Sequence, residues 1–287
     1  MKRRCCFLSM DDLAGYVSDD ELAINPLNDL GWEVSTISWR DPTVGWSQFE
    51  AVIVRTPWDY QEQPEEFLRV LRLIEDSSAR LENPISIIEW NLDKKYLRDI
   101  EHRGVRIVPT IWSDDLVSAE RFVEWKRKLA SDELIIKPTI SATAKDTFRL
   151  AEFDEHLIDL FEARSFMVQP FVRQVIEEGE FSLFYFNGIY SHTILKSPRK
   201  GDFRVQEEHG GLISAFNPEP KMLRAAEMIN ALINPTPLYS RIDLVRCDDG
   251  GFALMELELI EPALYFRMDE RSPYLFAQEF DRRMNEL

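Results

Sequence analysis

The chain has few of the residues that most often carry nucleophilic or metal chemistry. It contains three cysteines, of which Cys5 and Cys6 are adjacent and Cys247 is distant, and four dispersed histidines. The cysteines show no metal-ligand spacing, and three of them cannot all form disulfides. We therefore expect buried thiols and predict neither a Ser/His/Asp nor a Cys/His catalytic group.

Long apolar runs and a surplus of basic residues are also absent. No run approaches the roughly 18 residues of a membrane span, and the short run at 5–8 is closed by Asp11 and Asp12. Lys and Arg total 34 against 51 Asp and Glu, so the formal net charge is −17. The negative electrostatic field of so acidic a protein repels the phosphates of a nucleic-acid backbone and does not favour nucleic-acid binding. The 45% hydrophobic content predicts a globular, cytoplasmic protein that binds neither nucleic acid nor a membrane.

Glycine-rich phosphate loops are missing as well. No glycine occurs between Gly104 and Gly179, and the sequence has neither a Walker pattern nor G-x-G-x-x-G. A small anionic ligand would therefore need a local basic cluster or a divalent cation. The loop at 139–146 (TISATAKD), built of small and hydroxyl residues, is a weak candidate for a backbone phosphate cradle.

The first ninety residues alternate strand and helix patterns. Apolar, β-rich runs predict strands at 4–9, 33–39, 51–55 and 85–88. Phe67, Leu71 and Ile74 repeat at helical spacing. This alternation predicts a parallel α/β domain over residues 1–90.

Hairpin patterns become more frequent after residue 105. Helices are expected at about 92–104, where Asn91 could act as the cap, and at 119–129 and 221–233. Strands are expected at 133–137, 147–151, 168–171, 181–186, 189–195, 241–247 and 252–259. Asn187-Gly188 is a strong hairpin signal. The change in pattern predicts a second domain over residues 91–287.

The last predicted hairpin carries the strongest chemical signal. A two-residue turn at Asp249-Gly250 would pair Asp243 with Glu256 and Arg241 with Glu258 on one face. Because carboxylates directly opposite one another repel, the arrangement favours a cation between them, and oxygen ligands suit Mg²⁺. The alternative is an ordinary solvated face on which Arg241 forms salt bridges.

Several basic residues lie where they could meet an anion. Lys137 ends an apolar strand and needs a partner or a route to solvent. Lys94 stands near a predicted helix start. A basic loop follows the Asn187-Gly188 hairpin and contains Lys196, Arg199, Lys200 and Arg204. The alternative for this loop is a mobile, solvated segment.

Taken in order, these motifs resemble the ATP-grasp superfamily over roughly residues 90–265. Within it, the chain resembles the branch of bacterial glutathione synthetase and the ribosomal-protein glutamate ligases, and most nearly the O-ureidoserine cyclo-ligases of D-cycloserine synthesis and their uncharacterised relatives. The segments that carry this similarity are RTPWDY (55–60), KPTISA (137–142), GDFRVQ (201–206) and MELELIEP (255–262).

The resemblance implies an ATP-grasp fold, α/β in class and α+β in part. A small parallel α/β domain would cover residues 1–90. The ATP-grasp domain, 91–287, would contain a central lid subdomain at about 107–172 and a C-terminal subdomain built on an antiparallel sheet. ATP would lie between two antiparallel sheets.

The resemblance also implies a role for each matching residue. Nucleotide contacts would come from Lys94, Lys137, Ser141, Lys145, Gln169, Phe171 and Glu180. Groups that stabilise the transferred phosphoryl group would be Arg241, Arg204 and Lys196. Ligands for one or two Mg²⁺, or Mn²⁺ in their place, would be Asp243, Glu256 and Glu258. The sequence departs from the usual ATP-grasp pattern at two places. The loop at 141–147 lacks the usual glycines, and Glu258 stands where asparagine is common.

The implied reaction is an ADP-forming ligation. A substrate carboxylate would attack the γ-phosphate of ATP, and an amine or other nitrogen would then attack the acyl phosphate. Partners would be small carboxylate and amine substrates, amino-acid-like or peptide, and relatives often form homodimers. The rival functions are a nucleotide-binding protein without catalysis, a small-molecule kinase and an acidic scaffold.

The residues that follow the strand at 51–55 are hypothesised to recognise the substrate, since ligands favour the carboxyl ends of parallel strands. They are Arg55, Trp58, Asp59 and Tyr60, and Glu261 is added from the far hairpin. The alternative for Trp58 and Tyr60 is packing between domains.

Overall fold

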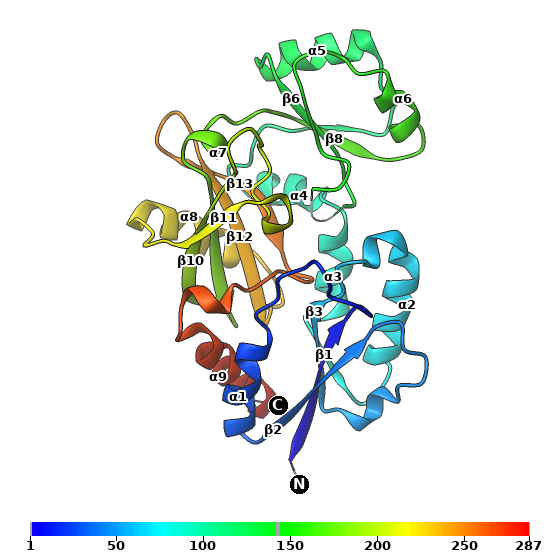
Figure 1. Cartoon of the computed structure of the whole chain (residues 1–287), viewed down its shortest axis with the longest axis vertical. Helices are drawn as coiled ribbons and strands as arrows, with labels where there is room; N and C mark the ends of the chain where they lie inside the picture. Colours follow the sequence, from blue (N-terminus) through cyan, green and yellow to red (C-terminus); the bar gives the residue numbers. More distant parts are fainter. Residues whose placement is uncertain (1, 142–143, 287) are drawn as a thin grey trace.

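Three β-sheets organise the computed structural model, which describes residues 2–141 and 144–286 (Figure 1). In the described part of the chain, no helix is long and apolar enough to cross a membrane. The combination of one parallel and two antiparallel sheets confirms the predicted fold class. The domain boundaries at 90, 107 and 172 remain predictions.

The first sheet, sheet A, is parallel and has the strand order β2-β1-β3-β4. Its strands are β1 (Arg3–Ser9), β2 (Trp32–Ser38), β3 (Ala51–Thr56) and β4 (Arg80–Glu82). The helices along it are α1 (Glu21–Asp29), α2 (Pro64–Glu75) and α3 (Ile85–Leu92), with short turns η1 (Trp46–Gln48) and η2 (Tyr60–Glu62). Every residue of β3 is buried, because one face packs on α2 and the other on the C-terminal helix α9 (Ser272–Asn285).

The predicted strand at 85–88 is wrong, since these residues form the first turns of α3. A short apolar run without flanking periodicity does not distinguish a strand from a buried helix. Pro84 precedes the helix in an extended conformation, which suits a helix start. The helix predicted over 92–104 is shorter, forming α4 (Tyr96–His102).

The second sheet, sheet B, is antiparallel and has the order β11-β10-β9-β12-β13. Its strands are β9 (Glu180–Phe186), β10 (Ile189–Ser197), β11 (Leu212–Ala215), β12 (Tyr239–Arg246) and β13 (Phe252–Glu258). One face packs on α4 and α8 (Pro220–Asn230), and α9 contacts β9 and β10. Short helical turns flank the sheet: α7 (Gln174–Glu177), η3 (Glu207–His209) and η4 (Phe266–Met268).

The third sheet, sheet C, has the order β5-β8-β6-β7 and stands apart from sheet A in Figure 1. Its strands are β5 (Ile111–Ser113), β6 (Leu134–Pro138), β7 (Phe148–Leu150) and β8 (Phe166–Pro170). The helices α5 (Ala119–Leu129) and α6 (His156–Phe161) complete a separate apolar core. Sheet C thus falls between residues 111 and 170, in the region expected to be the lid.

The carboxylate hairpin has the predicted cross-strand pairs. Asp243 pairs with Glu256 and Arg241 with Glu258. The turn differs, because Gly250 N donates to Cys247 O at 2.8 Å and Arg246 pairs with Phe252. An irregularity next to Asp243 shifts the register by one residue. The longer turn and the bulge compensate one another, so the predicted face is kept.

Two buried side chains fasten sheet A to sheet B. Asn83 accepts from Leu238 N at 2.7 Å and donates to Tyr239 O at 3.0 Å and Leu259 O at 2.7 Å. The Tyr239 hydroxyl contacts Val54 O at 2.6 Å and lies 2.9 Å from Ile260 O. Because these contacts occupy buried backbone groups, they fix how the ends of the two sheets meet.

Candidate active site

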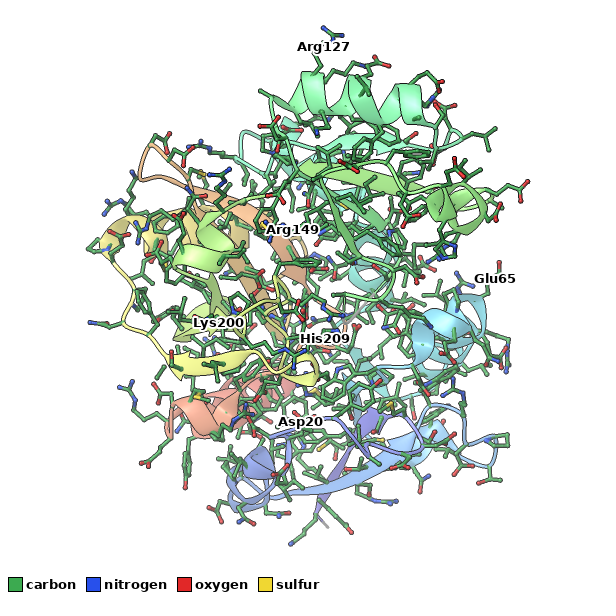
Figure 2. All side chains as sticks on the ribbon, turned by 45° about the horizontal axis from the view of Figure 1, so that its top comes forward. Asp20, Glu65, Arg127, Arg149, Lys200 and His209 are labelled. Carbon is green, nitrogen blue, oxygen red and sulfur yellow. The ribbon has the colours of Figure 1, made fainter. Side chains whose placement is uncertain are left out.

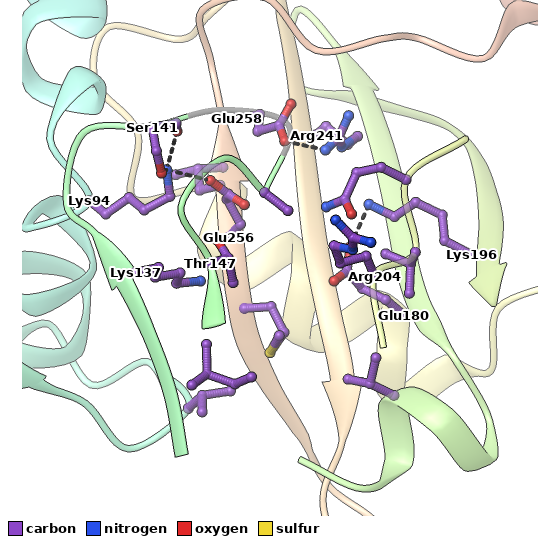
Figure 3. Close-up of a pocket in the computed structure, with 18 of the residues that line it drawn as sticks. Lys94, Lys137, Ser141, Thr147, Glu180, Lys196, Arg204, Arg241, Glu256 and Glu258 are labelled. Atoms are coloured by element: carbon purple, nitrogen blue, oxygen red, sulfur yellow. Dashed lines mark hydrogen bonds and ion pairs between the residues drawn. The ribbon is translucent and has the colours of Figure 1, made fainter. Parts of the chain in front are cut away.

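One pocket is lined by sheets B and C and by the loop that follows β3 (Figure 3). Along β13 its wall begins at Met255 and continues through Glu256 and Glu258, and beyond the strand it includes Glu261. Because a strand advances about 3.3 Å per residue, these positions follow one another along the length of the pocket.

The Met255 end is apolar. Val108 and Val172 belong to the same apolar cluster as Met255, and Ile135 and Phe171 also line the pocket. The Arg149 guanidinium lies 3.7 Å from the centre of the Phe171 ring. A flat, apolar group such as a nucleobase fits between these side chains.

Two residues that the resemblance assigns to nucleotide contacts, Gln169 and Phe171, line the pocket. Gln169 is buried, and its Nε2 donates to Thr110 Oγ1 at 3.0 Å. The backbone N–H of Phe171 donates to Glu133 O at 2.9 Å. An adenine contact by the Phe171 backbone would therefore use its carbonyl group.

The middle of the pocket is cationic. Lys94, which lies just before α4, is buried. Its Nζ lies 3.2 Å from Glu256 Oε1 and 3.5 Å from Ser141 Oγ, so the start of α4 lies next to β13. Lys137 extends from the end of β6 into the same space (Figure 3). Desolvation lowers the pKa of Lys137, and the negative charge of Glu256 opposes this shift. Among the described residues, no carboxylate forms an ion pair with Lys137.

A buried ion network lies across the pocket from Lys94. Lys196 contacts Glu180 and lies 3.1 Å from Asp243 Oδ2, while Arg241 lies 2.9 Å from the same oxygen and also contacts Glu258. Glu180, Lys196 and Asp243 are all at most 8% exposed. Asp243 is therefore held behind the pocket wall by two cations, and these cations lower its pKa to about 2 despite its burial.

Two of the predicted metal ligands line the pocket, Glu256 and Glu258, and their side chains are 30% and 28% exposed. Burial, followed by the charges of Glu256 and Asp243, raises the pKa of Glu258 to about 8 against the opposing effect of Arg241. At Glu258, burial and the neighbouring carboxylates thus outweigh the stabilising charge of Arg241.

An all-oxygen donor set short of positive charge fits a hard divalent cation such as Mg²⁺. Within residues 2–141 and 144–286, no three His, Cys, Asp or Glu side chains are yet grouped as metal ligands. Asp243, Glu256 and Glu258 share one face of the hairpin, but Asp243 is turned toward its cations. Of the predicted ligands, Glu256 and Glu258 are the ones that line the pocket.

Arg204 lines the pocket from the basic loop, where Asp202 orients it. Its Nη2 lies 2.9 Å from Asp202 Oδ2, and the Asp202 side chain also accepts from Arg204 N at 3.0 Å. The Arg204 side chain is 34% exposed.

The end beyond β13 is aromatic and acidic. Trp58 and Tyr60, from the loop after β3, are 9% and 5% exposed and line the pocket together with Glu261. Trp58 Nε1 donates to Glu261 O at 2.9 Å, and the Tyr60 hydroxyl hydrogen-bonds to the Glu261 carboxylate. Burial raises the pKa of Glu261 to about 7.

Besides Asp243, three predicted site residues are not among the residues that line the pocket. Arg55 is 1% exposed and bonds to Asp20 Oδ1 at 3.0 Å and Pro262 O at 2.9 Å, so it supports the segment after β13. Asp59 binds the Trp39 indole at 2.8 Å and Arg40. Lys145 is exposed and lies 3.4 Å from Glu62.

The glycine-poor loop achieves left-handed backbone conformations without glycine. Ala144 and Asp146 have φ values of 55° and 54°. Ala142 and Thr143, on which the proposed backbone cradle also depends, lie outside the described residues. Ser141 is placed at the pocket wall, hydrogen-bonded to Lys94.

The pocket residues that were not predicted include Tyr96, Tyr265 and Glu208. Tyr96 lines the pocket and its hydroxyl accepts from Leu257 N at 2.8 Å, whereas the sequence suggested only an apolar helix face. Tyr265 and Glu208 also line it. Tyr265 lies four residues after Glu261 and Glu208 closely follows the basic loop, so proximity to these motifs was the available signal.

The sheets and the pocket between them define an ATP-grasp ligase, an enzyme that forms a carbon–nitrogen bond at the expense of ATP. The same fold is found in D-alanine–D-alanine ligase from Bacillus anthracis complexed with ATP, with a TM-score of 0.70, 11% identity and coverage of 100% of this chain and 98% of that one.

The chain belongs to the family of the D-cycloserine synthetase DcsG. It is 32% identical over 272 residues to the cycloserine biosynthesis protein DcsG of Streptomyces lavendulae, which covers 89% of this chain and 90% of that protein. The crystal structure of D-cycloserine synthetase DcsG is similar with a TM-score of 0.83, 28% identity and coverage of 98% and 99%. The model of the N-terminal domain of D-cycloserine synthetase DcsG matches residues 5–83.

Proposed function

We propose that the enzyme activates the carboxylate of a small amino-acid-like substrate with ATP and joins it to a nitrogen, releasing ADP and phosphate. The observation that carries this proposal is the order of groups along one pocket: an apolar end, a cationic middle facing two carboxylates, and an aromatic, acidic end. A nucleotide and a second, smaller molecule can be placed end to end in such a pocket.

The nucleotide is assigned to the half that contains Met255. The base lies among the apolar side chains and Gln169, while Lys94 and Lys137 bind the phosphates as point charges. Arg241, Arg204 and Lys196 spread the negative charge of the transferred phosphoryl group, directly or by orienting one another. Glu180 is assigned to the ribose hydroxyls, and its ion pair with Lys196 holds it at the wall.

Glu256 and Glu258 would hold Mg²⁺, with Asp243 behind them. When bound, the ion neutralises charge on the phosphate oxygens. The substrate carboxylate oxygen forms a bond to the γ-phosphorus as the bond to ADP breaks. The nitrogen then bonds to the acyl carbon, phosphate leaves with the electron pair, and the nitrogen loses a proton.

The relative's name suggests the substrate class. DcsG is described as a D-cycloserine synthetase, and D-cycloserine is a cyclic amino-acid derivative. Since similarity extends over most of both chains, we propose an amino-acid-like substrate that supplies both the carboxylate and the nitrogen, so that the product is a ring.

The first experiment is calorimetric titration of Mg²⁺·ATP into the wild type and into Glu256→Gln. Loss of one carboxylate ligand should weaken binding by about tenfold or more. Glu124→Gln, on the exposed side of α5, is the matched control and should bind like the wild type. Equal binding by the Glu256 variant would remove this carboxylate from the metal site.

The second experiment separates a ligase from a kinase. ADP release is measured with carboxylate substrates in the presence and absence of the nitrogen group, O-ureidoserine being the first substrate to test. A ligase turns over continuously only when the nitrogen is present. Continuous ADP release with a stable phosphorylated product and no nitrogen would instead establish a kinase.

A further inference from the structure

The end of the pocket beyond β13 is distinct in composition from the part assigned to the nucleotide. Trp58 and Tyr60 come from the loop and short helical turn that follow β3, and Glu261 comes from the segment after β13. Lys94, the cation whose charge most lowers the pKa of Glu261, already lies 3.2 Å from Glu256 Oε1. The far end therefore presents negative charge and aromatic rings instead of cations.

Glu261 is the carboxylate of this region without a cationic partner. Glu256 pairs with Lys94 and Glu258 with Arg241, whereas Glu261 forms no ion pair within the described residues. Its side-chain partner is the Tyr60 hydroxyl. A carboxylate offers about four acceptor positions, so Tyr60 leaves room for further donors.

The carboxylate is also held in place. Trp58 Nε1 fixes the Glu261 backbone at 2.9 Å, and Arg55 fixes the carbonyl of the next residue, Pro262, at 2.9 Å. The Trp58 ring is itself supported by Tyr16, with centroids 5.4 Å apart. A partly buried, positioned carboxylate beside two aromatic rings is the usual composition of a site for an ammonium group.

We infer that Glu261, with Trp58 and Tyr60, binds the ammonium group of the amino-acid-like substrate and so orients its carboxylate toward the cationic middle of the pocket. This inference rests on the proposed function, because it assigns to the second substrate the space that the nucleotide leaves. The unpaired state of Glu261 agrees with it, since an ammonium group would supply the missing positive charge.

The test is calorimetric titration of ammonium-bearing probes into enzyme saturated with Mg²⁺·ADP. The probes are D-cycloserine, D-serine and L-serine, and the matched neutral compounds are their N-acetyl derivatives. At least one free amine should bind, with its N-acetyl derivative about tenfold weaker or more. Glu261→Gln should weaken the same probe by a similar factor, and Glu261→Asp should restore part of the loss.

Two controls keep the result interpretable. Mg²⁺·ADP affinity of Glu261→Gln should stay within about twofold of the wild type, which also reports correct folding. Glu65→Gln, at the edge of the molecule on α2, should leave probe binding unchanged (Figure 2).

Three outcomes would overturn the inference: equal binding of amine and N-acetyl probes, undiminished binding by Glu261→Gln, or no probe bound by nucleotide-loaded wild type. In each case, if Mg²⁺·ADP still bound, the assignment of the nucleotide to this pocket would remain supported and only the ammonium site would be refuted. Failure of Mg²⁺·ADP to bind would refute the proposed function together with the inference.

Discussion

His192 allows a quantitative test of the sheet B core, because it is a buried histidine kept neutral. It is 4% exposed and stacks on Phe184 with ring centroids 4.3 Å apart. Nε2 lies 3.1 Å from Leu264 O and Nδ1 lies 2.9 Å from Ser191 Oγ. Since a carbonyl only accepts, Nε2 carries the proton and Nδ1 accepts from the serine hydroxyl.

Burial lowers the pKa of His192 from 6.5 to about 4, although the nearby charge of Asp269 opposes this shift. In the unfolded chain His192 is protonated near pH 6.5, whereas in the folded protein it is protonated only near pH 4. The stability contributed by the neutral ring is therefore complete above pH 6.5 and is lost as the pH falls from 6.5 toward 4. At 1.36 kcal/mol per pH unit the full loss is about 3 kcal/mol, and about 1 kcal/mol of it falls between pH 7 and 5.5.

The first assay is an NMR titration of the histidine ring protons, with His192 assigned by its absence in His192→Gln. The resonance should remain that of a neutral ring down to pH 5. In urea unfolding, the stability difference between wild type and His192→Gln should shrink by about 1 kcal/mol from pH 7 to 5.5. The exposed His156→Gln should show no such change. A ring that titrates near pH 6.5, or a constant stability difference, would refute the reasoning.

Two further predictions concern nucleotide binding and the junction of the sheets. Lys137→Met should weaken Mg²⁺·ATP binding in calorimetry by about tenfold or more, because a desolvated cation at the pocket wall is lost. The control variant Lys128→Met, on the exposed side of α5, should bind Mg²⁺·ATP like the wild type. If Lys137→Met also bound with wild-type affinity, Lys137 would not be part of the phosphate site. Asn83→Ala should lower the free energy of unfolding by about 3 kcal/mol or more, because three buried backbone groups lose their partner. The exposed Asn217→Ala should change it by less than about 0.5 kcal/mol, and a similar small effect at Asn83 would contradict the assigned role.

The hairpin shows both the strength and the limit of reasoning from sequence. Alternation and a turn signal were enough to pair Asp243 with Glu256 and Arg241 with Glu258. The turn itself was wrong, and the pairs survived because a bulge restored the register. Bulges depend on how a strand fits its neighbours, so local sequence does not reveal them.

Partners from distant strands were the part that could not be predicted. Asp243 was expected to face a metal, but β10 places Lys196 3.1 Å from it. Asn91 was expected to cap a helix, yet its side chain donates to Leu257 O at 2.8 Å and accepts from Leu259 N at 2.9 Å. Arg55, at the end of β3, and Asp59, in the loop that follows, lie close in sequence to Trp58 and Tyr60, but their side chains contact structural partners outside the pocket.

The ties through Asn83 and Tyr239 determine which part of the molecule can turn to admit ligands. They join the ends of sheets A and B, and backbone bonds at Arg106 and Val108 hold the chain against Leu254 until it enters sheet C. A hinge just after Val108 therefore breaks the fewest of these contacts. Swinging of sheet C would open the nucleotide half of the pocket, while the end formed by Trp58, Tyr60 and Glu261 would keep its shape throughout the cycle. Selectivity for the proposed second substrate would then depend on the end of the pocket next to the joined sheets A and B, and not on the part formed by sheet C.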